Sequence, residues 1–393
     1  MVRVLMLLSL TMLMLGCEAP SARTAAPTFA AAGALPTATA TPPPMLAAPT
    51  ASASERQTVN NTWLYLTAFQ SGNVSVIDPL NGHVLREFSV VGDQAGMAVA
   101  PDGSRLYILD GQQGGELRVY RTGMWDVIHR EPIQHYAHLL GGNPITLSGD
   151  GRWLVVAHLN VDTRQGWNSV FDTQQMVFLP DDALPLRACR EAWLPVHLLG
   201  QANQPRVYAD CNGFIQVLDA ATLKPLWQVN APTAINPALA LSPDGTRLYG
   251  VYPRVNDLRL QVWQTSDGTL LKEQLLGDRL SIPPATFGRG EGVYLALVPD
   301  GTQFYLAWED RLWALATNSL RPLGELQLPA PADGLAISGD GRELYLLPAT
   351  AGDLTTRERG LWTVDASTLK LIRHAPDWPA YTVPFFFAAP GVK

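Results

Sequence analysis

Basic side chains, cysteines and long apolar runs are all scarce in this 393-residue sequence. Lys and Arg number 28 against 35 Asp and Glu, and the formal net charge is −7 at pH 7. Because nucleic-acid surfaces need an excess of Lys and Arg, this balance argues against nucleic acid as a partner. The three cysteines are too few for a disulfide scaffold or for a four-cysteine zinc site.

Motifs that carry recognised chemistry are also missing. No Gly-x-Ser-x-Gly segment occurs, so a hydrolase-type serine nucleophile has no support. The glycine-rich residues 288–292 are not followed by the Gly-Lys-Ser/Thr of a phosphate-binding loop. The sequence therefore favours a protein that is not an enzyme.

The first sixteen residues have the pattern of an export signal. Arg3 precedes an apolar run from Val4 to Leu15, which is shorter than the roughly 20 residues needed to span a bilayer. Residues 14–17, Met-Leu-Gly-Cys, resemble the lipobox of bacterial lipoproteins. We expect residues 1–16 to be a lipoprotein-type signal peptide and Cys17 to be acylated, which anchors the protein to a membrane of the bacterial envelope. The alternative is an ordinary signal peptide with an incidental cysteine.

Residues 17–58 consist mainly of Ala, Pro, Thr and Ser after the cysteine. A segment with so few large apolar side chains cannot offset its loss of conformational entropy by burial. We therefore expect a disordered stalk that holds the folded body away from the membrane. A pro-segment removed by proteolysis is the alternative.

One pattern recurs from about residue 60 onward: an apolar strand, a tight turn, and a bulky apolar residue followed by Tyr. Glycine adopts a positive φ without steric cost, and an Asp carboxylate accepts hydrogen bonds from the amides of its own turn. Each copy therefore predicts a β-hairpin. The Asp-Gly pairs of the five plain copies lie at 102–103, 150–151, 244–245, 300–301 and 340–341.

The spacing of the second strands predicts the repeat unit. Consecutive marker residues lie 40 to 56 positions apart, which fits a four-stranded propeller blade of about 40–50 residues. A third strand with period-two alternation follows each marker, plainly at 117–120 and 260–263 and most weakly at 176–178. The markers are Tyr65, Tyr107, Val155, Tyr208, Tyr249, Tyr305 and Tyr345.

The two ends of the body predict how the ring closes. Leu64-Tyr65 has no first strand before it, and residues 384–391 look like a first strand with no second strand after it. Pairing the two completes a seventh blade and removes exposed strand edges. The sequence thus predicts an all-β, seven-bladed β-propeller over residues 59–393. The alternatives are a six- or eight-bladed ring and an open sandwich.

The Ser-Pro-Asp-Gly-x-x-Leu-Tyr repeat, plain at 242–249, and Val-x-Val-Ile-Asp third strands, as at 74–78, carry a family resemblance. They resemble the Tyr-Val-Thr-Asn and lactonase-like propeller superfamily of bacterial surface and periplasmic proteins. The resemblance covers about residues 60–393 and implies the fold. This superfamily holds both binding proteins and enzymes, so the resemblance does not fix a function.

Polar residues precede five of the first strands, which in a propeller line the central channel. A ring of carboxylate and amide oxygens at the channel mouth would suit Ca²⁺, and the resemblance implies calcium there in lactonase-like relatives. The alternative is that Asp and Asn stand there as ordinary turn residues, with no cofactor bound. The candidate residues for a ligand or metal are Asp93, Asn143, Asn236, Glu291 and Asp333.

The body contains two cysteines, Cys189 and Cys211. A disulfide between them is chemically permitted in an exported protein. The repeat places Cys189 in an outer strand and Cys211 in the second strand of the next blade, so the unbonded state stays open as well.

An anchor, a stalk and a rigid ring together would display a binding surface away from the membrane. The sequence therefore favours a non-catalytic binding or scaffold module on the bacterial cell envelope, with an unidentified protein or small molecule as its ligand. A metal-dependent, lactonase-like hydrolase with its site at the channel mouth is the first alternative. An accessory subunit of an envelope assembly is the second.

Overall fold

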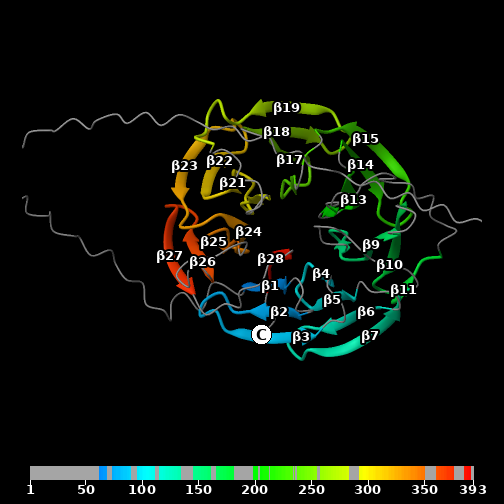
Figure 1. Ribbon diagram of the computed structural model, residues 1–393. Helices are drawn as coiled ribbons and strands as arrows, with labels where there is room; N and C mark the ends of the chain where they lie inside the picture. Colours follow the sequence, from blue (N-terminus) through cyan, green and yellow to red (C-terminus); the bar gives the residue numbers. More distant parts are fainter. Residues whose placement is uncertain are drawn as a thin grey trace, which may run out of the picture. The chain divides into compact units, whose positions relative to one another are not determined.

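Seven four-stranded antiparallel sheets follow one another around a central axis in the computed structural model (Figure 1). Each sheet is one blade of a β-propeller, and no helix occurs among the described residues. All described residues belong to one unit, residues 51–393. The structure describes residues 62–68, 73–89, 95–110, 115–133, 145–160, 165–180, 198–201, 204–211, 213–232, 234, 237–254, 257–282, 292–349, 360–375 and 385–390.

Blade 1 combines strands from both ends of the described chain, and the later blades follow in sequence. From the innermost strand outward, blade 1 contains β28 (Phe385–Pro390), β1 (Thr62–Ala68), β2 (Asn73–Ile77) and β3 (Val84–Ser89). Blade 2 contains β4 (Ala95–Val99), β5 (Arg105–Asp110), β6 (Glu116–Arg121) and β7 (Asp126–Pro132). Blade 3 contains β8 (Ile145–Leu147), β9 (Trp153–Asn160), β10 (Gln165–Asp172) and β11 (Val177–Phe178).

The remaining four blades have the same layout. Blade 4 contains β12 (Leu198–Gln201), β13 (Gln204–Asp210), β14 (Phe214–Asp219) and β15 (Pro225–Asn230). Blade 5 contains β16 (Ala238–Leu241), β17 (Arg247–Arg254), β18 (Asp257–Gln264) and β19 (Leu270–Leu275). Blade 6 contains β20 (Val293–Leu297), β21 (Gln303–Trp308), β22 (Arg311–Ala316) and β23 (Pro322–Gln327). Blade 7 contains β24 (Ala332–Ile337), β25 (Glu343–Pro348), β26 (Leu361–Asp365) and β27 (Lys370–Ala375).

The marker residues confirm the number of blades. Each of the seven lies on the second strand of a different blade and is at most 1% exposed. A bulky side chain at this position fills the space between neighbouring sheets, where close packing is required. The predicted seven-bladed ring is therefore confirmed.

The prediction that residues 176–178 form the third strand of blade 3 is wrong. The third strand is β10, which pairs with β9 over eight residues, and residues 177–178 form the short outer strand β11. Strand β10 ends at Asp172, whose carboxylate accepts hydrogen bonds from the amides of Gln174 and Gln175. Asp219 and Asp365 end β14 and β26 in the same way. In these three blades the Asp, and not the apolar pair that follows, marks the end of the third strand.

The turns between first and second strands follow the predicted Asp-Gly chemistry. In the turn of blade 5, the Gly245 amide donates to the Ser242 carbonyl at 2.8 Å, and the Asp244 carboxylate accepts from the Thr246 amide at 3.0 Å. Gly245 has a φ of +69°, a value that side chains with a Cβ disfavour. These bonds recur in blades 2, 3, 6 and 7.

The turns between third and fourth strands share a residue in the left-handed region. Its amide donates to the carbonyl four residues earlier, at 2.7 to 2.9 Å in all seven blades. Five of these residues carry large apolar side chains, which we call pegs because they point back into the seam with the preceding blade. The seven positions are Gly82, Trp125, Met176, Leu223, Gly268, Leu320 and Leu369.

The hydrophobic core lies in the seams between blades. Seven separate clusters of buried side chains occur, one between each pair of neighbouring blades. One of them joins Leu64 and Leu66 of blade 1 to Tyr345 and Leu347 of blade 7. Within the described residues, every blade therefore packs against a neighbour on both sides, including the first and the last.

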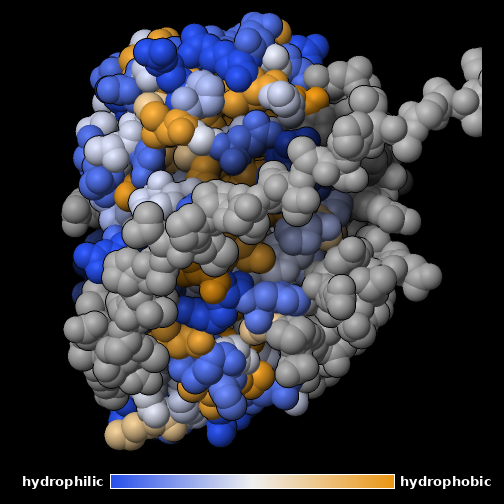
Figure 2. All heavy atoms as spheres, turned by 90° about the vertical axis from the view of Figure 1, so that its left-hand side faces the viewer, coloured by the Kyte–Doolittle hydropathy of each residue, from blue (hydrophilic) through white to orange (hydrophobic). Residues whose placement is uncertain are grey.

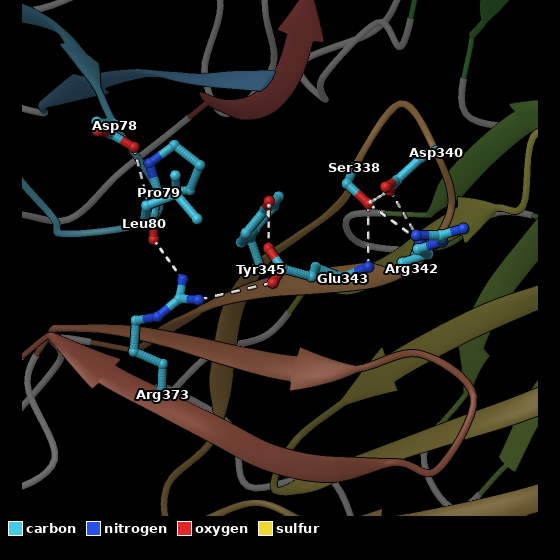
Figure 3. A network of polar contacts seen from close by, with 9 residues as sticks. All are labelled: Asp78, Pro79, Leu80, Ser338, Asp340, Arg342, Glu343, Tyr345 and Arg373. Atoms are coloured by element: carbon cyan, nitrogen blue, oxygen red, sulfur yellow. Dashed lines mark hydrogen bonds and ion pairs between the residues drawn. The ribbon is translucent and has the colours of Figure 1, made fainter. Parts of the chain in front are cut away.

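Side-chain hydrogen bonds cross several of these seams to the same backbone position. Arg105, Arg206 and Tyr305 donate to the carbonyl that follows the third strand of the next blade, at 2.9, 2.8 and 2.7 Å. Arg373 makes this bond from blade 7 to the Pro79 carbonyl of blade 1 at 2.7 Å (Figure 3). Its guanidinium also lies 3.6 Å from the Glu343 carboxylate. The last blade is thus bound to the first by the contacts that join the others.

Strand β28 closes the ring as predicted. It pairs antiparallel with β1 from Thr62↔Pro390 to Thr67↔Phe385, and Tyr65 lies opposite Phe387. Figure 1 shows β28 as the innermost strand of the blade that also holds β1. Residues 62–390 therefore close the ring without any earlier part of the chain.

The ring has two unlike faces and a strand rim. We call the end with the first-to-second and third-to-fourth turns the turn face, and the opposite end the loop face. On the rim, six outer strands contain a β-bulge, which disfavours pairing with another sheet edge. Outside the grey residues, Figure 2 shows hydrophobic groups scattered among hydrophilic ones on the side that carries β23 and β27.

Candidate functional site

Asp333 is the one residue of the predicted channel-mouth set that the structure describes. It lies in β24, the innermost strand of blade 7, at the loop-face end of that strand. The pairing of β24 with β25 shifts between Ala332 and Gly334, so Asp333 is the extra residue of a β-bulge. Bulges redirect side chains and are frequent beside functional sites. The other four, Asp93, Asn143, Asn236 and Glu291, lie outside the described residues.

Tyr294 of the neighbouring blade is the described partner of Asp333. Its hydroxyl donates a hydrogen bond to Asp333 Oδ1 at 2.8 Å. Tyr294 belongs to β20, so the pair joins the innermost strands of blades 6 and 7. A Cβ placed on Gly292 would clash with the Tyr294 hydroxyl oxygen. A glycine at 292 therefore lets the phenol occupy this place.

Burial dominates the electrostatics of the pair. It raises the pKa of Asp333 to about 6, although the hydrogen bond from Tyr294 opposes the shift. Burial and the neighbouring Asp333 charge together raise the pKa of Tyr294 well above its ordinary value. Tyr294 is therefore a neutral donor, while Asp333 changes its charge near pH 6.

Backbone contacts from the adjoining turns hold Asp333 in position. The amide of Ala332 donates to the carbonyl of Glu309, in the turn between β21 and β22, at 2.9 Å. The amide of Ala349, just after β25, donates to the Pro331 carbonyl at 2.7 Å. The two residues just before Asp333 are therefore held by backbone hydrogen bonds.

Sequence reasoning missed Tyr294 and three further carboxyl groups near the loop face. Asp110, Asp210 and Glu309 are at most 5% exposed and lie at or just after the ends of second strands. Asp110 is 3.9 Å from the Arg118 guanidinium. A usable signal was present, because each acidic residue follows its Tyr marker by two to four positions. Buried carboxylates of this kind need charged or hydrogen-bonding partners.

The described residues contribute little to a calcium site. Ca²⁺ takes six to eight oxygen ligands, whereas Asp333 supplies one carboxylate with one oxygen bonded to Tyr294. Within the described part of the chain, no three His, Cys, Asp or Glu side chains gather as metal ligands. The calcium site, and the hydrolase that depends on it, stay predictions.

Cys211 lies directly after β13 and is buried. Its sulfur takes part in a disulfide. Cys189 lies outside the described residues, as does the lipidation candidate Cys17, so the Cys189–Cys211 pairing and the acylation stay predictions. No helix in the described part of the chain is long and apolar enough to cross a bilayer.

Comparison with solved structures agrees with the geometry of the ring. A functionally unknown protein from Desulfotomaculum acetoxidans matches with a TM-score of 0.59 and 12% identity, over 84% of this chain and 99% of that one. Hydrazine synthase from Kuenenia stuttgartiensis matches with a TM-score of 0.55 and 14% identity, over 78% of this chain and 93% of that one. These likenesses show the fold alone. No protein-family model and no curated protein matches the sequence, so the resemblance to the lactonase-like superfamily stays a prediction.

Proposed function

We propose that this chain is a non-catalytic binding or scaffold module, held on the bacterial cell envelope through acylated Cys17, with a protein or small-molecule ligand at its loop face. The observation that carries the proposal is the difference between the two faces. On the turn face, the backbone amides of the short turns donate hydrogen bonds to carbonyl and carboxylate groups of the same turn. At the loop face, the bulged Asp333 brings a carboxyl group to the innermost strand.

On the turn face, these polar groups are hydrogen-bonded within their own turns. The rigid ring can therefore hold the loop face in place for a ligand. Binding residues collect on loops and strand ends that a scaffold holds in place. Asp333 shares one oxygen with Tyr294, and no described basic side chain contributes to its electrostatics. A ligand with a positive charge or a hydrogen-bond donor is therefore the chemistry that this carboxylate favours.

The anchor is tested by metabolic labelling with an alkyne-bearing fatty acid. We expect the full-length chain to be labelled and to sediment with membranes, and Cys17→Ser to lose both properties. An unlabelled wild-type protein in the soluble fraction would contradict the anchor.

The binding face is tested by photo-crosslinking in intact cells. Thr246 and Arg254 are both exposed; Thr246 directly precedes strand β17 at the turn face, and Arg254 ends that strand at the loop face. A photoreactive amino acid at 254 is expected to give a defined adduct by mass spectrometry, and the same group at 246 is expected to give none. Adducts from 246 alone, or equal adducts from both positions, would overturn the assignment of the loop face.

A further inference from the structure

A small aromatic and thioether surface lies on the turn face where blades 1 and 2 meet. We call Trp63, Met124 and Trp125 the Trp patch. The two indole rings are 5.3 Å apart between centroids and inclined by 31°. Trp125 also contacts Phe88 with centroids 5.7 Å apart. Met124 is 68% exposed, more than any other large apolar side chain that the structure describes.

The seam between the blades does not account for this exposure. Trp125 is the peg of blade 2, but it stays half-buried, whereas the equivalent Leu223 and Leu320 are fully buried. Leucine thus suffices to fill a seam at this position. The larger indole extends the apolar surface beyond the seam and toward Met124.

The patch lies where the N-terminal segment joins the ring. Strand β1 begins at Thr62 on the turn face, one residue before Trp63. The 61 residues that precede it include the predicted acylation site, so a membrane anchor would be connected to the body beside the patch. A tether of this kind gives a weak surface contact a high effective concentration.

The chemistry around the patch suits a lipid surface. Tryptophan is favoured at the boundary between headgroups and acyl chains, because its apolar ring carries one polar N–H. Two arginines flank the rings: Arg86 stacks over Phe88 at 5.8 Å, and Arg121 contacts the Met124 sulfur at 3.7 Å. Arg121 also lies 3.7 Å from Asp126, with both side chains about half exposed. Arginines at the edge of an apolar surface reach lipid phosphates while their stems cover apolar groups.

We propose that the Trp patch docks on a lipid bilayer, so that the turn-face edge of blades 1 and 2 rests on the membrane and the loop face points away. Its role in the cell rests on the proposed anchor at Cys17, but its affinity for lipid belongs to the ring itself. The other exposed leucines that the structure describes lie on the outer strands of the rim and not in the turns of the turn face. Leu323, for example, is the bulged residue of the outer strand β23 in blade 6.

The test measures binding of residues 59–393, which contain the whole closed ring, to vesicles of phosphatidylethanolamine with one quarter phosphatidylglycerol. We expect sedimentation with the vesicles and quenching of tryptophan fluorescence by brominated acyl chains. Met124→Glu is expected to weaken partitioning at least about fivefold, since it places a charge in the contact. The matched control Leu323→Glu, at a residue that is 58% exposed, is expected to change it less than about twofold.

Trp125→Leu separates lipid contact from folding, because leucine stands at the same position in blades 4, 6 and 7. We expect this variant to keep the wild-type unfolding midpoint and to lose most of the tryptophan quenching. Equal effects of Met124→Glu and Leu323→Glu, or no binding to vesicles, would overturn the proposal. A dimer that Met124→Glu dissolves would also overturn it, in favour of a second copy as occupant. Labelling of Cys17 without vesicle binding refutes only the patch, and the reverse result refutes only the anchor.

Discussion

Single residues in this ring are constrained where one blade meets the next. The glycine of a first-to-second turn is the clearest case, because both its backbone and its surroundings exclude a side chain. Gly341 has a φ of +73°, and a Cβ there would lie 2.9 Å from Pro299 Cδ and 3.0 Å from Val298 Cγ1 of the preceding blade. Conformation and contact therefore require glycine independently.

Gly341→Ala is expected to lower the free energy of unfolding by about 1–3 kcal/mol, because the Cβ meets both a strained φ and a close neighbour. Gly339 in the same turn is the control. Its φ is not positive, and its nearest neighbour, Thr62 Oγ1, is 3.9 Å from the added Cβ. Gly339→Ala should change stability by no more than about 0.5 kcal/mol. Urea unfolding measures both, and equal losses would contradict this account of the turn.

Asp333 is expected to make the folded ring less stable as the pH rises, which is the reverse of the usual effect of a carboxyl group. Its folded pKa of about 6 exceeds the unfolded value of about 3.9, so the folded chain binds the proton more tightly. The stability contribution of this proton is full below pH 4 and is lost as the pH rises through 6. We expect a loss on the order of 2 kcal/mol across this window. Asp333→Asn, which can still accept from Tyr294, should abolish that loss in unfolding measured between pH 4 and 7.

The pKa values of the turn carboxylates are shifted in the opposite direction, so these groups serve as an internal control. Hydrogen bonds from Ser104 and Ser242 lower the pKa values of Asp102 and Asp244. Their stabilisation is present above about pH 4 and is lost as the pH falls below it. Asp333→Asn should leave that acid limb unchanged, and a change confined to the acid limb would contradict the assignment to Asp333.

At the scale of elements, the strands and their turns follow from the sequence much more closely than the packing between blades. The Asp-Gly turns of five blades and the bulky marker within each second strand are local signals, and together they predict all seven second strands. The pegs could not be predicted, because a positive φ at Leu223 or Leu320 has no signal in residue type. The Asp333–Tyr294 pair depends on a bulge and on contact between blades, and neither can be read from spacing along the chain.

Removal of a peg tests the packing of these elements. Leu320→Ala is expected to cost about 2–5 kcal/mol, because the residue is fully buried between blades 5 and 6 and alanine leaves a cavity at the same φ. Leu323→Ala in the same blade, at an exposed position, should cost no more than about 0.5 kcal/mol. If both variants unfold at the same urea concentration, the pegs do not hold the seams.

At the scale of the whole molecule, stability depends on the junction between the last and the first blade. Arg373 donates to the Pro79 carbonyl and faces Glu343, which is largely buried. Arg373→Met keeps the apolar stem but removes the hydrogen bond to the Pro79 carbonyl and the ion pair with Glu343, so a loss of about 1–3 kcal/mol is expected. The control is Arg311→Met, which breaks a more exposed pair with Glu325 inside blade 6 and should cost less than about 1 kcal/mol. If urea unfolding shows a larger loss of stability for Arg311→Met than for Arg373→Met, stability does not depend mainly on the junction between the last and the first blade.

Hydrogen exchange of the unmodified protein tests whether β28 closes the ring. Terminal segments ordinarily fray and exchange fast, whereas amides paired inside a cooperative sheet exchange through global opening. We predict that the bonded amides of residues 385–390 exchange as slowly as those of residues 62–68. Fast exchange at 385–390 beside a protected β1 would show that the last strand does not complete blade 1.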